Sequence, residues 1–122
     1  MNTWGPKDHI GLGAGHSFTW LVGDPESHPT DDARFLRWRG QDETLVGIIH
    51  WHPRPDARPG DLDGGRCGGA VMFVRGESEP ERDVWAVHSL EPLHVEPSIL
   101  CNAAKCGCGS HGWIRDGRWV PA

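Results

Sequence analysis

Short apolar segments separated by polar turns run along most of this chain, and no segment has a sustained apolar period of 3.6 residues. Four segments rich in β-branched and aromatic residues are each followed within two residues by glycine or proline, which is the composition of strands that end in turns. These segments are residues 16–22, 44–52, 70–74 and 84–90. The sequence therefore predicts a mostly β fold, a small single domain of antiparallel strands and hairpins.

The segment 33–39 suits a short helix about as well as a strand. We favour a strand, because residues 40–43 then form a hairpin turn into the next segment. A clearer hairpin is predicted near the end of the chain. There Asp116-Gly117 is a strong signal for a two-residue turn with positive φ at both positions, which pairs residues 113 and 114 with residues 120 and 119.

Composition and charge limit the classes of function. The formal net charge of -5 disfavours nucleic-acid binding, which depends on neutralising phosphates. No apolar run approaches the roughly 20 residues needed to cross a membrane. The N-terminus has no charged start followed by an apolar stretch, so it does not resemble a secretory signal. We therefore expect a soluble, cytoplasmic protein.

Three of the four cysteines and one histidine gather in residues 101–111, with the spacing C-x4-C-x-C-x2-H. Thiolate and imidazole are the ligands that tetrahedral zinc prefers. Without a secretory signal, clustered cysteines favour a metal over disulfides. The sequence thus predicts a structural zinc ion. In the expected single domain of residues 1–122, residues 1–15 form a flexible lead-in, and residues 98–122 form a zinc knuckle followed by the hairpin.

Structural zinc sites usually combine ligands from a tight turn with ligands from a distant element. Cys67, which precedes two glycines, is the natural distant ligand, and His52 is the next candidate because it shares one face of the predicted strand 44–52 with His50. The full set of candidate ligands is Cys67, Cys101, Cys106, Cys108, His111 and His52. We expect Cys108, His111 and Cys67 in the site, and the remaining place is open among the other three.

Catalysis is disfavoured by the motifs that are absent from the sequence. Neither HExxH nor H-x-E followed by P-C-x-x-C occurs, and a thiolate-rich zinc with four protein ligands is structural. A serine nucleophile is not indicated either. Ser110 precedes His111 in the sequence, but adjacency along the chain says nothing about a catalytic arrangement in space.

The C-terminal part carries a resemblance to a known family. The sequences PSILC at residues 97–101, CGSHGW at 108–113 and IRDGRW at 114–119 resemble the ending shared by a family of small uncharacterised domains. These domains occur in actinobacterial phages and in bacterial operons, some of them near ubiquitin-like conjugation genes. HPRPD at 52–56 and CGG at 67–69 are also similar to the family. This chain departs from the pattern by extra residues between Cys101 and Cys108. The resemblance implies a zinc-bound β domain and supplies no activity.

We therefore expect a small, zinc-stabilised accessory or structural protein, of phage origin and acting in the host cytoplasm, that binds a protein partner or assembles with itself. Exposed tryptophans and extended proline segments would supply its contact surface. The alternative is a zinc-dependent hydrolase associated with a protein-modification system. A nucleic-acid-binding zinc module is the third hypothesis. No small-molecule substrate is indicated.

Overall fold

The computed structural model describes residues 9–53, 66–100 and 111–122, and these parts of the chain are mostly β, as predicted. In chain order the elements are β1 (Ile10–Gly13), β2 (His16–Gly23), the short 3₁₀ helix η2 (Trp38–Gly40), β3 (Thr44–Pro53), β4 (Arg66–Met72), β5 (Ala86–Leu90), β6 (Leu93–Glu96), β7 (Ile99–Leu100), β8 (His111–Arg115) and β9 (Arg118–Pro121). The four predicted strands correspond to β2, β3, β4 and β5. In the part of the chain that the structure describes, no helix is long and apolar enough to span a membrane.

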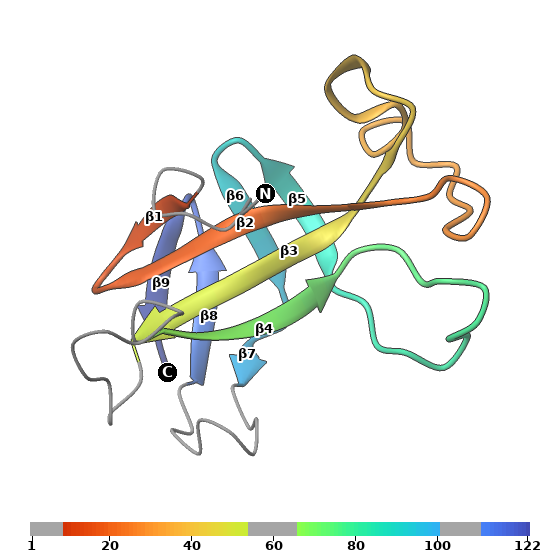
Figure 1. Cartoon of the computed structure of the whole chain (residues 1–122). Helices are drawn as coiled ribbons and strands as arrows, with labels where there is room; N and C mark the ends of the chain where they lie inside the picture. The colour runs from red at the N-terminus through yellow and green to blue at the C-terminus, as the bar shows by residue number, and fades with distance from the viewer. Residues whose placement is uncertain (1–8, 54–65, 101–110) are drawn as a thin grey trace.

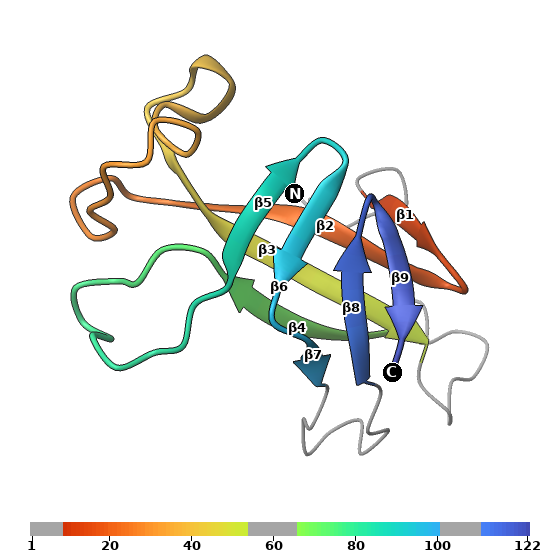
Figure 2. The same cartoon turned by 180° about the vertical axis from the view of Figure 1, so that it is seen from behind.

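Two layers of antiparallel strands face each other (Figure 1). In one layer β1, β2, β3 and β4 are hydrogen-bonded in chain order. In the other layer β5 pairs with β6, β8 pairs with both β7 and β9, and β6 lies beside β8. Figure 2 shows β5, β6, β8 and β9 crossing in front of the long strands β2 and β3. Packing of this kind buries the inner faces of both layers in one core.

The core determines which side of each strand faces solvent. Ile48 and Val71 enter it from the four-stranded layer, and Leu93, Val95 and Ile114 enter it from the second layer. Each of these side chains is at most 2% exposed. Burying such a side chain stabilises the fold by about 1.5–3 kcal/mol. Because side chains alternate along a strand, the residues between them in β6 and β8 point outward.

None of the described tryptophans is fully exposed, as the predicted contact surface would require. Each of them is buried or half-buried: Trp20, Trp38, Trp51, Trp85, Trp113 and Trp119. An indole is a large apolar body, so its burial in a chain of this size stabilises the core more than exposure would. A protein partner therefore stays a prediction, and exposed tryptophans no longer support it.

The predicted flexible lead-in, residues 1–15, contains the strand β1, whereas its first eight residues lie outside the described part of the chain. Its glycine-rich composition suggested flexibility. However, Leu12 is only 2% exposed in the core, and the segment pairs with β2. Burial of this leucine and the strand pairing are tertiary effects that outweigh the local freedom of glycine.

The segment 33–39 is also not the strand that was favoured. It forms turns that lead into η2, and the φ angles of Arg37 and Arg39 are 45° and 52°. Positive φ values lie outside the strand region of backbone conformation. The prediction of a strand and a hairpin here is therefore wrong.

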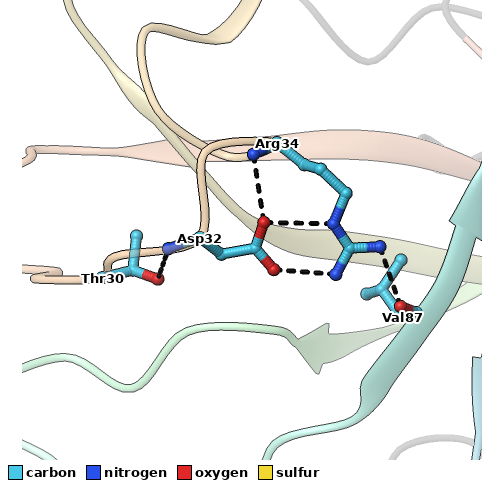
Figure 3. A network of polar contacts seen from close by, with 4 residues as sticks. All are labelled: Thr30, Asp32, Arg34 and Val87. Carbon is cyan, nitrogen blue, oxygen red and sulfur yellow. Dashed lines mark hydrogen bonds and ion pairs between the residues drawn. The ribbon is translucent and has the colours of Figure 1, made fainter.

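Asp32 organises this turn segment (Figure 3). Its carboxylate accepts hydrogen bonds from the backbone N–H of Arg34 at 3.0 Å and from the Nε and Nη2 of Arg34 at 3.0 and 2.7 Å. These side-chain hydrogen bonds are the main reason that the pKa of Asp32 is lowered. The Nη1 of Arg34 donates to the carbonyl oxygen of Val87 at 2.9 Å, so one guanidinium ties the loop to β5.

The C-terminal hairpin has the predicted turn and register. Asp116 and Gly117 have φ angles of 51° and 74°, and residues 113 and 114 pair with residues 120 and 119. The backbone N–H of Gly117 donates to the carbonyl oxygen of Leu93 at 2.8 Å, which fixes the turn against β6. This part of the sequence prediction is confirmed.

Three histidines form a cluster beside Trp119: His16 in β2, and His50 and His52 in β3. The Nδ1 of His16 lies 3.0 Å from the Nε2 of His50, whose ring stacks on Trp119 with the centroids 4.7 Å apart. Burial, with smaller effects from the neighbouring His16 and His52, lowers the pKa of His50 to about 3. Burial and His52 lower the pKa of His16 to about 4. Both rings are therefore neutral at pH 7 and pack as aromatic groups.

Stability should fall as the pH drops below the ordinary histidine pKa of 6.5, because the unfolded chain then binds protons that folded His16 and His50 bind only near pH 4 and pH 3. Above pH 6.5 this stabilisation is fully present. For His50 the loss is about 1.4 kcal/mol per pH unit, and half-buried His16 contributes less because solvent screens it. Urea unfolding between about pH 7.5 and about pH 5 measures the free energy of unfolding.

Replacing the buried ring should flatten this pH dependence. We expect a smaller slope for His50→Phe, whereas His88→Gln, at an exposed position of β5, should keep the wild-type slope. A wild-type free energy of unfolding that does not change over this pH range would contradict the neutral state of His16 and His50.

Gly112 in β8 has no room for a side chain. A Cβ at this position would collide with the carbonyl oxygen of Val120 and lie 2.7 Å from the Cζ2 of Trp119. Gly112→Ala should therefore destabilise the protein by about 1–3 kcal/mol, measured as a lower thermal midpoint. Gly11→Ala in β1 is the matched control, because nothing lies within 4 Å of the added Cβ. Equal midpoints for the two variants would show that this close approach does not limit the packing.

Candidate active site

Ser98 and His111 meet on the outward face of the second layer. Ser98 lies between β6 and β7, and His111 is the first residue of β8. The Oγ of Ser98 and the Nε2 of His111 are 2.9 Å apart, which is hydrogen-bonding distance. His111 is exposed and Ser98 is half-buried, so a molecule can approach the pair from solvent.

The pairing of β7 with β8 brings these two residues together. Ile99 faces Gly112 and Leu100 faces His111 across the two strands. Ile99 is buried at 6% exposure, so the side chains before and after it, those of Ser98 and Leu100, point outward. Ser98 is thereby the diagonal neighbour of His111, at a separation that side chains can span.

The outward face of β8 continues from His111 to Trp113 and Arg115. The rings of His111 and Trp113 have their centroids 5.9 Å apart at an interplanar angle of 31°. The guanidinium carbon of Arg115 lies 4.6 Å from the centre of the Trp113 ring, and its Nε lies 3.5 Å from the Oε1 of Glu96. These contacts hold the indole beside the Ser98–His111 pair.

A histidine that meets a serine hydroxyl through Nε2 is the arrangement that activates serine as a nucleophile, because the imidazole accepts the hydroxyl proton as the oxygen attacks. Among residues 9–53, 66–100 and 111–122, the hydrogen bonds of the His111 side chain include this one and none to a carboxylate. The intervening segment 101–110 contains no aspartate or glutamate. The described geometry is thus a serine–histidine dyad.

A second serine–histidine contact exists in the four-stranded layer but is poorly placed for chemistry. The Nδ1 of His9 lies 2.9 Å from the Oγ of Ser17. Ser17 is only 8% exposed, so its hydroxyl is shielded from any substrate. The exposed pair on β7 and β8 is therefore the better candidate.

The structure does not bring the predicted zinc ligands into one described group. Cys101, Cys106 and Cys108 lie outside the described residues. Cys67 is disulfide-bonded, whereas the zinc hypothesis assigns it a thiolate. His111 directs its Nε2 to a serine hydroxyl. The zinc site stays a prediction.

His52 and Cys67, two predicted ligands from different strands, are direct partners across β3 and β4. His52 is 3% exposed, and its Nδ1 lies 3.1 Å from the carbonyl oxygen of Pro53. His50 lies on the same buried face, as the alternation predicts. Within the described ranges, no group of three or more histidine, cysteine, aspartate or glutamate side chains is arranged to hold a metal ion.

The sequence pattern predicted a functional role for His111, but as a zinc ligand. It did not indicate Ser98 as a functional residue. The serine considered was Ser110, which lies outside the described residues. Ser98 and His111 are 13 positions apart, and their contact depends on the register of β7 and β8. The one available signal was the PSI sequence at residues 97–99, which marks a serine just before a short buried strand.

A pocket of about 290 Å³ lies at the opposite end of the second layer. Its lining includes Phe18, Trp20, Leu93 and Gly117. Leu93 begins β6 and Gly117 follows β8, whereas Ser98 follows β6 and His111 begins β8. The dyad therefore lies outside this pocket.

Comparison with known proteins bears on the C-terminal part of the chain. No curated protein and no solved structure matches the chain. A family model matches residues 65–122, just under half of the chain, a range that holds β4 to β9 and includes both members of the dyad. This segment is similar to the family described as the bacterial ubiquitination-like system serine protease, BubE.

Proposed function

We propose that the protein is a serine peptidase of a bacterial ubiquitination-like system, with Ser98 as the nucleophile and His111 as the general base. The observation that carries this proposal is the 2.9 Å contact between the Oγ of Ser98 and the Nε2 of His111, inside the segment that is similar to a serine protease family. Both residues lie where a polypeptide can reach them from solvent.

In the first half of the reaction, the Oγ of Ser98 attacks the carbonyl carbon of the scissile bond, and its proton passes to the Nε2 of His111. The carbonyl oxygen takes the negative charge of the tetrahedral intermediate. As this intermediate collapses, the amine leaves and takes the proton from Nε2. The acyl group remains as an ester on Ser98.

In the second half, a water molecule attacks the ester carbonyl and gives its proton to the Nε2 of His111. Collapse of this intermediate releases the carboxylic acid product. The departing Oγ of Ser98 recovers the proton from Nε2, which restores the starting dyad.

The position of the imidazole follows from the sheet. His111 is paired with Leu100 through the backbone, and its ring is tilted against that of Trp113. Prepositioning of this kind lowers the entropic cost of bringing base and nucleophile together. We infer that strand pairing and this ring contact supply part of the orientation that a carboxylate supplies in other serine enzymes.

This proposal keeps part of the alternative that the sequence suggested, a hydrolase associated with a protein-modification system. It replaces the zinc-activated water with a serine nucleophile. The similarity to a ubiquitination-like family agrees with the resemblance to domains near ubiquitin-like conjugation genes. A structural zinc ion and a phage origin remain separate predictions, and neither takes part in the proposed reaction.

A fluorophosphonate probe should label Ser98 covalently, because it traps an activated serine in the first chemical step. Peptide mapping by mass spectrometry identifies the labelled residue. Ser98→Ala should abolish labelling, and His111→Ala should slow it by roughly a thousandfold, in line with the loss of one member of a catalytic unit.

Two serine variants serve as controls for this experiment. Ser89→Ala removes a serine that is paired with His94 across β5 and β6, and Ser110→Ala removes the serine beside His111 in the sequence. Both proteins should be labelled at the wild-type rate. Labelling on Ser110, or no labelling of folded wild-type protein, would overturn the assignment.

A chelator should not inhibit the chemistry itself. We expect that labelling of Ser98 in the presence of a strong chelator falls only as far as the folded fraction falls, with folding followed by circular dichroism on the same samples. The reason is that the proposed nucleophile is a hydroxyl rather than a metal-bound water. A folded protein that loses activity on chelation and regains it with zinc would instead support the zinc hydrolase.

A further inference from the structure

We infer that Leu100 and Trp113, here called the apolar shelf, bind the substrate side chain next to the carbonyl that Ser98 attacks, and that the substrate there is an extended polypeptide with a large apolar residue. This inference rests on the proposed function and specifies the substrate class of the same site. It follows from the arrangement of four outward-facing side chains around the dyad.

The four side chains occupy the corners of one small patch of sheet. Leu100 faces His111 directly, and the next position along the same register places Trp113 across from Ser98. The dyad therefore forms one diagonal of the patch, and the apolar shelf forms the other. Both shelf residues lie within the distance that separates direct or same-face neighbours in a strand pair, so both flank the nucleophile.

Leu100 is 55% exposed, the highest value among the large apolar side chains that are exposed in the described residues. A single exposed leucine is ordinary on a protein surface. This one differs in its position, because it is paired with the proposed general base. An acyl group on Ser98 therefore lies close to this side chain.

The indole of Trp113 is held in place before any substrate arrives. The guanidinium of Arg115 lies 4.6 Å from its ring centre, and Glu96 contacts that guanidinium at 3.5 Å. A ring already fixed by its neighbours loses little conformational entropy when a ligand packs on it. The ring is half-buried and so leaves part of its surface available.

The location and the apolar character of the shelf favour an apolar substrate side chain as its ligand. A group that acylates Ser98 must approach the outward face of β7 and β8, where Leu100 is exposed and Trp113 is half-buried. Leu100 and Trp113 present apolar surface and no charge to a bound substrate. An apolar side chain that packs on them is stabilised by the removal of its surface from water, whereas a polar side chain gains much less free energy.

Covalent peptide probes test the inference without a known substrate. We use two peptidyl diphenyl phosphonates that differ only in leucine or serine beside the phosphorus, which takes the place of the scissile carbonyl. In each case the Oγ of Ser98 displaces phenol from phosphorus. A small dialkyl fluorophosphonate without a peptide part measures the reactivity of the dyad. For each protein, the rate constant for either peptide probe is divided by the rate constant for the fluorophosphonate.

Wild-type protein should react roughly 10-fold or more faster with the leucine probe than with the serine probe, which is the discrimination expected from burying one apolar side chain. Leu100→Ser should reduce this preference to about 3-fold or less. Leu36→Ser is the matched control, because Leu36 is 43% exposed in the loop between β2 and β3. It should keep the wild-type preference.

The possible failures of the two proposals are distinguishable. If the small fluorophosphonate does not label Ser98, the proposed function fails. If it labels Ser98 but wild-type protein shows no preference for the leucine probe, or reacts with neither peptide probe, the apolar shelf is not a substrate subsite. An equal loss of preference in the Leu100→Ser and Leu36→Ser variants would also overturn the inference.

Discussion

The register between β7 and β8 is the constraint on which the candidate site depends. Ile99 and Gly112 face each other on the inner side of this pair, where Ile99 is buried and Gly112 has no space for a Cβ. A slip of one residue would turn every side chain of the strand to the other face. It would bury Ser98 and separate it from His111. Packing of the inner face thus determines the geometry of the outer face, where the dyad lies.

The four-stranded layer supports this register from behind. Trp119 lies close to Gly112 on one side, and on the other its ring stacks with His16 and His50 at centroid distances of 4.3 and 4.7 Å. Neutral imidazoles can pack in this way because burial keeps them unprotonated. The histidine cluster therefore has a structural role, because it connects β2 and β3, through Trp119 in β9, to the neighbouring strand β8, which carries His111.

The open position of the dyad is consistent with a polypeptide substrate. Small-molecule sites are usually concave and enclose most of their ligand. Here the proposed nucleophile and base lie on the outward face of a strand pair, beside one leucine and one indole. Such a surface contacts a short stretch of an extended chain and leaves the remainder of a large substrate outside.

Features that depend on neighbouring residues were predictable from the sequence: the β class, most strands, and the Asp116-Gly117 turn with its register. Alternation within β3 also placed His50 and His52 on one face correctly. The strand β1 and the turns at 33–39 were not predictable in this way, because they depend on the burial of Leu12 and on the hydrogen bonds of Asp32, which local propensity does not contain. The same holds for the dyad. The cysteine-rich segment favoured a metal site as the interpretation of the C-terminus. The contact between residues 98 and 111 instead arises from strand pairing between residues 13 positions apart, and no local sequence pattern specifies that pairing.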